Sequence, residues 1–152
     1  MTASNHFVTS AVLGTVIANP WIGIPVAVAS HFVLDALPHY GCPVFHKDKP
    51  GEIRLYFAVL AVDAIIFLAL MVWAIVAIDN ALLAAYGFAG FSPDIVWLYR
   101  YGVLARIGKV DKPPGKIEAF HHRIQKFESM GGLLVEIPYF IAIGALLLWI
   151  LQ

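Results

Sequence analysis

The segment "SHFVLDALPHYG", residues 30–41, places three candidate metal ligands in an otherwise apolar run. His31, Asp35 and His39 recur every four residues, and each step of four advances a helix by only about 40° beyond a full turn. His31 and Asp35 therefore share one helix face. Pro38 is expected to end the helix, which leaves His39 on the first loop residue, free to turn inward. Imidazole nitrogens and carboxylate oxygens gathered in this way suit a divalent cation such as zinc.

The chain around this segment has the composition of a membrane protein. Of its 152 residues, 61% are hydrophobic and only 13% are charged, and the mean hydropathy is +0.80. Soluble domains contain about 45–50% apolar and about 25% charged residues. The formal net charge of zero argues against a nucleic-acid partner, which normally needs a basic surface. The length and composition favour one domain, residues 1–152, embedded in lipid.

The single cysteine and the first ten residues exclude two further kinds of feature, a cysteine-based site and a secretory signal. Cys42 is the single cysteine, so it can form neither an intramolecular disulfide nor a thiolate metal site alone. The first ten residues contain no Lys or Arg, so they lack the positive start of a secretory signal, and we expect them to be mature sequence.

Apolar runs and turn signals predict an all-α membrane protein. We expect a compact bundle of about four to five transmembrane or re-entrant helices, plus one short cytoplasmic amphipathic helix. Asn19-Pro20 divides the first two runs, so residues 6–39 should form a helical hairpin. The remaining predicted elements are a span over 55–78, a span over 80–105 broken by Gly87, Gly90 and Pro93, an amphipathic helix over 113–128, and a final span over 133–151.

Charge predicts the topology and the depth of the polar residues. All ten Lys and Arg residues fall within 47–54 and 100–126, and the positive-inside rule places both clusters in the cytoplasm. His31 and Asp63 each lie eight residues from the end of an apolar run, or roughly 12 Å deep at ~1.5 Å per residue. A carboxylate at such depth costs about 2.5–3.5 kcal/mol even on the lenient insertion scale. We therefore expect Asp35, Asp63 and Glu136 to face the bundle interior.

The predicted topology brings several ionisable residues to the same side of the bundle. Of the adjacent pair His121 and His122, one is expected to face inward and the other outward. Asp94, in "SPDI", could equally cap a helix or begin a turn. The candidate metal ligands are His6, His31, Asp35, His39, Asp94, His121 and His122.

Three further residues are candidates for catalysis rather than metal ligation. Asp63 or Glu136 would orient a ligand histidine or serve as a general base, as carboxylates beside a metal often do. Arg123, next to the histidine pair, would hold a phosphate group in bidentate fashion.

Four motifs resemble a family of small prokaryotic membrane-bound metal-dependent hydrolases. They are an early histidine, the "H-x3-D-x2-P-H" helix end, a mid-chain "PD", and a late His-His-Arg before a final span. The element "HFVLDALPH" is also similar to the His-x3-Asp helices of zinc-dependent phospholipase C, which bind a cluster of zinc ions. The resemblance implies a prokaryotic inner-membrane protein whose ligands are His6, His31, Asp35, His39, Asp94 and one of His121 or His122.

The leading functional hypothesis is a hydrolase at the cytoplasmic membrane face that uses one or more zinc ions, or another divalent metal. Its substrate would be an ester or phosphoester, with a lipid or lipid-linked molecule favoured by the location. One alternative is a haem-binding electron-transfer subunit with two axial histidines. Another is a non-catalytic membrane subunit, in a homo-oligomer or a larger complex, whose small residues around Ala84, Ala85 and the "GFAG" of 87–90 allow close helix contact.

Overall fold

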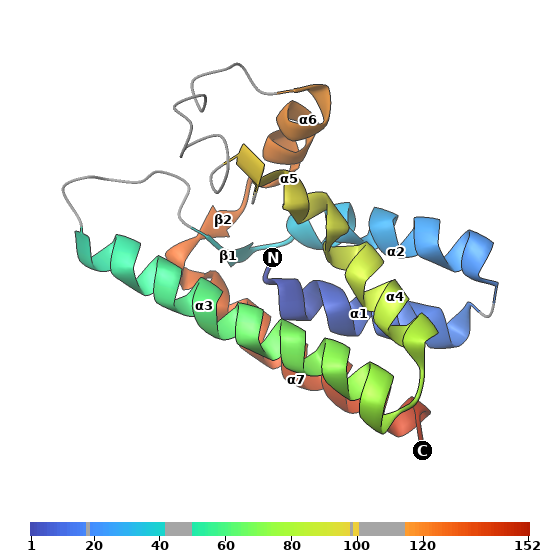
Figure 1. Cartoon of the computed structure of the whole chain (residues 1–152). Coiled ribbons are helices and arrows are strands. Elements are labelled where there is room, and N and C mark those ends of the chain that lie inside the picture. Colours follow the sequence, from blue (N-terminus) through green and yellow to red (C-terminus); the bar gives the residue numbers. More distant parts are fainter. Residues whose placement is uncertain (18, 42–49, 98, 101–114) are drawn as a thin grey trace.

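The computed structural model describes residues 1–17, 19–41, 50–97, 99–100 and 115–152, and these are mostly helical, as the sequence predicts (Figure 1). Cys42, His46 and the first residues of the predicted helix over 113–128 lie outside the described residues. The longer elements are α1 (Ala3–Val16), α2 (Pro20–Asp35), α3 (Pro50–Val72), α4 (Ala81–Phe91), α6 (Lys116–Ile124) and α7 (Leu133–Ile150). The shorter ones are β1 (His39–Tyr40), η1 (Trp73–Ala77), η2 (Ser92–Asp94), α5 (Ile95–Trp97), β2 (Glu128–Ser129) and η4 (Met130–Gly132).

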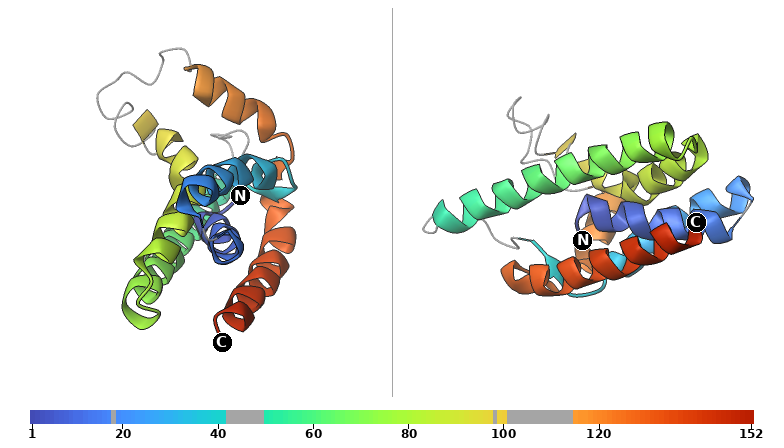
Figure 2. Two further views of the ribbon diagram at one scale, coloured as in Figure 1. Left: turned by 90° about the vertical axis from the view of Figure 1, so that its right-hand side faces the viewer. Right: turned by 90° about the horizontal axis from the view of Figure 1, so that it is seen from below.

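Helix α1 is the centre of the bundle. It packs against α2, α3, α4 and α7, and Figure 2 shows it enclosed between α7 and the pair α3 and α4. A helix that is covered on all sides has no need of an amphipathic stripe, and α1 has none. Its buried residues include polar ones alongside apolar ones: Ser4, Asn5, His6, Phe7, Val8, Ser10 and Ala11.

Small residues let α4 approach α1 closely. A methyl group added at Gly90 would lie 1.9 Å from Ser10 Oγ and 2.9 Å from the His6 carbonyl oxygen, and one at Gly87 would meet the ring of Phe7. Only glycine fits such contacts without moving a helix. The "GFAG" segment therefore serves packing between helices of this chain, and it brings the C-terminal end of α4 beside His6.

Two helices among the described residues are long and apolar enough to cross a membrane. They are Arg54–Ala77, which joins most of α3 to η1, with mean hydropathy 2.7, and Met130–Ile150, which contains α7, with mean hydropathy 2.2. Only 17% and 11% of their most apolar windows are buried, so most of their apolar side chains face outward. Helix α2 is apolar as well but shorter.

The end of α2 departs from the prediction that Pro38 stops the helix. The helix ends at Asp35, three residues earlier, and the chain then forms the two-residue strand β1. Strand β1 pairs in parallel with β2, in the register His39 with Glu128 and Tyr40 with Ser129. His39 is therefore a strand residue rather than a free loop residue. This pairing ties the end of α2 to the junction between α6 and α7.

Candidate metal centre

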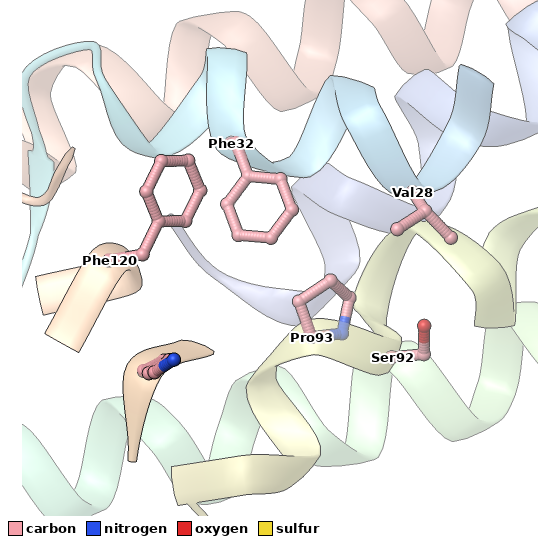
Figure 3. Close-up of a pocket in the computed structure, with 6 residues that line it drawn as sticks. Val28, Phe32, Ser92, Pro93 and Phe120 are labelled. Atoms are coloured by element: carbon pink, nitrogen blue, oxygen red, sulfur yellow. The ribbon is translucent and has the colours of Figure 1, made fainter. Parts of the chain in front are cut away.

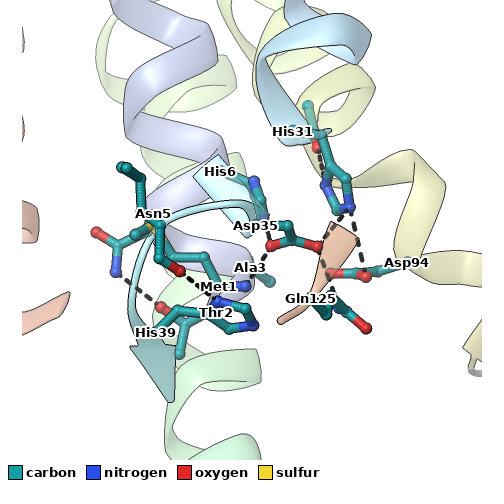
Figure 4. Close-up of polar contacts among 12 residues, drawn as sticks. Met1, Thr2, Ala3, Asn5, His6, His31, Asp35, His39, Asp94 and Gln125 are labelled. Atoms are coloured by element: carbon teal, nitrogen blue, oxygen red, sulfur yellow. Dashed lines mark hydrogen bonds and ion pairs between the residues drawn. The ribbon is translucent and has the colours of Figure 1, made fainter. Parts of the chain in front are cut away.

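Four buried or partly buried side chains from three separate elements converge at one end of the bundle. His31 and Asp35 come from the last turns of α2, Asp94 ends η2, and His121 lies in α6. Each offers one ligand atom, and these four atoms all lie within 4.8 Å of one another. Figure 4 shows the side chains of His31, Asp35 and Asp94 directed toward a common point. We call these four residues the His–Asp group.

The separations within the His–Asp group scatter around those expected for a four-coordinate metal. The two Nε2 atoms of His31 and His121 lie 3.0 Å apart, and Asp35 Oδ2 lies 3.2 Å from the first and 2.7 Å from the second. Asp94 Oδ1 is 3.6 Å from His31 Nε2 and 3.7 Å from His121 Nε2. Four ligands at about 2.0–2.2 Å from a zinc ion stand about 3.3–3.6 Å from one another in a tetrahedron. The observed values surround that range.

Hydrogen bonding fixes which nitrogen of His31 carries a proton. Nδ1 lies 2.8 Å from the carbonyl oxygen of Gly90, which can only accept, so Nδ1 donates. Nε2 of the neutral ring then holds a lone pair, and it faces Asp35 Oδ2 and the Nε2 of His121. Two acceptor atoms, His31 Nε2 and Asp35 Oδ2, therefore face each other where His31, Asp35 and His121 are each fully buried, and His121 Nε2 lies within hydrogen-bond distance of both. A cation shared by these atoms would stabilise the contact between the two acceptors, and imidazole with carboxylate is a donor set that zinc prefers.

Three more groups surround Asp35. Its Oδ1 contacts the amino group of Met1 and lies 3.2 Å from His6 Nε2. The ring of His6 stacks on that of His31 at a centroid distance of 4.0 Å, so His6 lies beside the His–Asp group without being one of its four members. Gln125 donates from Nε2 to Asp35 Oδ2 at 3.1 Å. Gln125 is not among the sequence-predicted site residues, and its signal is the four-residue spacing from His121, which places it just after the end of α6.

The two remaining candidate histidines take different positions. His122 is exposed, so within the pair it is His121 that faces inward. His39 is buried but is not part of the His–Asp group, and its Nδ1 lies 2.8 Å from the Leu37 carbonyl oxygen. Burial lowers the pKa of His39 below its ordinary value, since the charged imidazolium would lose its hydration.

Asp94 is the most accessible member of the His–Asp group. Its side chain is 20% exposed, whereas those of His31 and His121 are fully buried. Burial raises the pKa of Asp94 to about 6 in the absence of a cation, because the carboxylate loses hydration. A cation held by the group would favour the ionised form instead.

Asp63 and Glu136 lie near this centre but contact the first turn of α1. Asp63 accepts hydrogen bonds from the backbone N–H groups of Ala3, at 2.7 Å, and Ser4, at 3.1 Å, and from the Ser4 hydroxyl. These N–H groups have no partner within the helix, and the positive end of the helix dipole favours a carboxylate there.

Glu136 completes the same attachment from the opposite side. It accepts from the Thr2 hydroxyl at 2.5 Å, the Thr2 N–H at 3.0 Å, the Asn5 side chain at 3.1 Å and the Tyr40 N–H at 2.8 Å. We call Asp63 and Glu136 the anchoring carboxylates, since they fix α1, which carries His6, to α3 and α7. Neither is among the four ligand residues of the His–Asp group.

Arg123 is exposed and is not one of the four members of the His–Asp group. It lines a surface cavity of about 440 Å³ together with Lys126, Phe120 and Phe127. Its guanidinium group is therefore available to an anion at the surface of α6.

Comparison with known proteins gives no relative for this chain: no family model, curated protein or solved structure matches it.

Proposed function

We propose that this protein is a membrane-embedded, zinc-dependent hydrolase that cleaves an ester or phosphoester at the cytoplasmic face of the membrane. The observation that carries the proposal is the convergence of His31 Nε2, His121 Nε2 and Asp35 Oδ2, with Asp94 Oδ1 close by. His31 Nε2 and Asp35 Oδ2 are both acceptors and face each other at 3.2 Å in the buried interior, and a shared cation would stabilise both atoms.

In such a site each residue would have a separate role. His31, Asp35, Asp94 and His121 would hold the ion, and Gly90 fixes the orientation of His31 through its hydrogen bond. Gln125 holds Asp35 in place from α6. A zinc ion supplies Lewis acidity and lowers the pKa of bound water toward neutrality. Asp94, the partly exposed member, marks the side from which water and substrate would enter.

Two further observations support the membrane location. The two apolar helices expose most of their surface, as lipid-facing spans do. Asp63 and Glu136 both lie in the first halves of these helices, so the polar centre sits toward their starting ends. Basic residues of α6 and its surroundings, Lys116, Arg123 and Lys126, lie at this end as well, and the positive-inside rule assigns it to the cytoplasm.

The spacing of the histidines favours a single metal ion over haem. Axial ligands of a haem lie on opposite faces of the macrocycle. Here the rings of His6 and His31 are stacked in direct contact, and the Nε2 atoms of His31 and His121 are 3.0 Å apart. No macrocycle fits between these pairs.

The test compares two adjacent histidines. The wild-type protein, His121→Ala and His122→Ala are purified in neutral detergent, and their zinc content and hydrolysis of bis(p-nitrophenyl) phosphate and p-nitrophenyl acetate are measured. We expect zinc and activity to be lost in His121→Ala and retained in His122→Ala. Equal zinc content in all three proteins rejects the metal site. Zinc that depends on His121 without hydrolysis of either ester rejects the enzyme and leaves a metal-stabilised membrane subunit.

A further inference from the structure

A cavity of about 500 Å³ opens directly beside the His–Asp group. It is lined by Val28, Phe32, Ser92, Pro93, Lys116 and Phe120 (Figure 3). Three of its walls are formed by the immediate sequence neighbours of the group: Phe32 follows His31, Pro93 precedes Asp94, and Phe120 precedes His121. The same three elements, α2, η2 and α6, therefore build both the cavity and the group.

Phe32 forms the partition between the cavity and the buried histidines. Its ring packs edge-on against His31 at a centroid distance of 5.2 Å and against His121 at 5.6 Å. It also packs against Phe120 at 5.4 Å. The side chain of Asp94 is 20% exposed, and Asp94 directly follows the cavity residue Pro93. A molecule in the cavity thus contacts sequence neighbours of the group, with the ring of Phe32 between it and the two histidines.

The chemistry of the cavity suits a hydrocarbon chain with an anionic end. Its walls are aliphatic and aromatic, with charge supplied by the exposed Lys116. Across Phe120, the second cavity adds Arg123 and Lys126 to the same surface of α6. Apolar walls with a few placed polar groups are typical of sites for small amphiphilic molecules, and ammonium and guanidinium groups favour phosphate.

We propose that the Phe32–Phe120 cavity binds an acyl chain of an anionic phospholipid drawn from the surrounding membrane, with the lipid phosphate between Lys116 and the His–Asp group. This inference rests on the proposed function and names the substrate class of the same site. Ile24 lies one helical turn before the cavity residue Val28 and is exposed, so a lipid chain can reach the cavity along this face of α2 without crossing water.

The experiment uses phosphatidylglycerol with a photoreactive diazirine in its acyl chain, mixed into phosphatidylcholine nanodiscs that contain the zinc-loaded protein. Peptides labelled after illumination are identified by mass spectrometry. We expect label on the peptides that carry Phe32 and Phe120. Val28→Trp fills the cavity and should abolish this label. Val33→Trp, a matched change on the exposed surface of α2 outside the cavity, should leave it intact.

A second pair of variants tests the charge. Lys116→Glu should remove the preference for labelled phosphatidylglycerol over labelled phosphatidylcholine, and Arg54→Glu, an exposed change on α3, should not. Unlabelled phosphatidylglycerol should compete for the label, whereas free glycerol phosphate should not, since it lacks the chain.

The outcomes separate this inference from the function on which it rests. Label that is equal in Val28→Trp and Val33→Trp, or that glycerol phosphate displaces as well as lipid does, overturns the lipid site even when zinc is bound. Zinc content is measured on every sample. Wild-type protein that holds no zinc overturns the proposed function, whatever the labelling pattern.

Discussion

The anchoring carboxylates and Asp35 of the His–Asp group are close neighbours in one buried polar region, yet their surroundings differ. Asp63 and Glu136 are met by donors: backbone N–H groups, hydroxyls and an amide. Asp35 also receives donors, from Gln125 and the Met1 amino group, but its Oδ2 faces in addition the Nε2 of His31, which holds a lone pair because Nδ1 donates elsewhere. Asp35, Asp63 and Glu136 are all buried, but of these three only Asp35 faces an acceptor in the contacts described above.

The kind of partner around a buried carboxylate therefore indicates its role better than its degree of burial does. A buried carboxylate with a full set of donors is already stabilised and needs nothing more. A buried carboxylate that faces another acceptor gains stability from added positive charge. The anchoring carboxylates thus have their partners within the protein, whereas the His–Asp group has a donor set that could hold a metal ion.

The largest expected effect is the loss of metal from Asp35→Asn. The amide keeps the shape of the carboxylate but removes its charge and presents a donor to one side of the group, so zinc content should fall from about one ion per chain to near none. Elemental analysis of the purified protein measures this. Glu136→Gln is the matched control and should retain zinc; a loss of zinc from Glu136→Gln but not from Asp35→Asn contradicts the division between the two sets.

Removal of an anchoring carboxylate should chiefly lower stability. Glu136→Ala leaves the N–H groups of Thr2 and Tyr40 without this partner, and a buried donor without a partner costs about 1–3 kcal/mol. The free energy of unfolding in detergent should fall by about that amount or more, while the folded fraction still binds zinc. Unchanged stability would show that water replaces the carboxylate and that α1 is not held by it.

A methyl group at the contact between α1 and α4 should produce an intermediate effect. Gly90→Ala places a Cβ 1.9 Å from Ser10 Oγ, so the helices must separate, which typically costs about 1–3 kcal/mol. Because the Gly90 carbonyl orients His31, zinc affinity should fall with stability. Gly144→Ala on α7 is the control, since nothing lies within 4 Å of its added Cβ. Equal melting temperatures for the two variants would contradict the close approach.

Gln125→Leu should weaken zinc binding without preventing it. The amide donates to Asp35 Oδ2, and loss of such a supporting hydrogen bond typically reduces metal affinity about 10–100-fold. Competition with a chromophoric chelator measures the change. A zinc affinity equal to that of wild type would show that the hydrogen bond from Gln125 does not contribute to metal binding.

The smallest expected effect is a change in the pH dependence of stability caused by His39. Its folded-state pKa lies below the ordinary value of 6.5, so the unfolded chain takes up a proton first as the pH falls. The stability from neutral His39 is fully present above pH 6.5 and is lost as the pH falls toward the lowered pKa. His39→Gln should flatten this part of the curve of melting temperature against pH. If the slope of melting temperature against pH is unchanged in His39→Gln between about pH 7.5 and about pH 5.5, the pH dependence of stability arises from other groups.

Most of the helices could be predicted from the sequence because they correspond to apolar runs, and α6 could be predicted from its amphipathic pattern. The Asn19-Pro20 pair divides α1 from α2 as expected, and Asn19 also accepts a hydrogen bond from the N–H of Trp21 at the start of α2. The shared helix face of His31 and Asp35 also follows from spacing alone. Both features depend on residues within one or two turns of each other.

The partners of the polar side chains could not be predicted because they depend on contacts between distant segments. Nothing near Asp63 or Glu136 in the sequence indicates that each binds the first turn of α1. The pairing of β1 with β2 joins two-residue strands, which are too short to leave a periodic pattern. The four-residue spacing places His39 with His31 and Asp35 as a metal ligand. In the structure His39 belongs to the paired strand β1 and is not part of the His–Asp group.

The long sequence separation within the anchoring contacts has a consequence for biosynthesis. Thr2 and Glu136 are 134 residues apart, so the first turn of α1 gains this partner only after nearly the whole chain has left the ribosome. His121, too, emerges late, long after His31 and Asp35. The members of the His–Asp group are therefore apart during most of the synthesis of the chain, and the group can assemble only after α6 has been made.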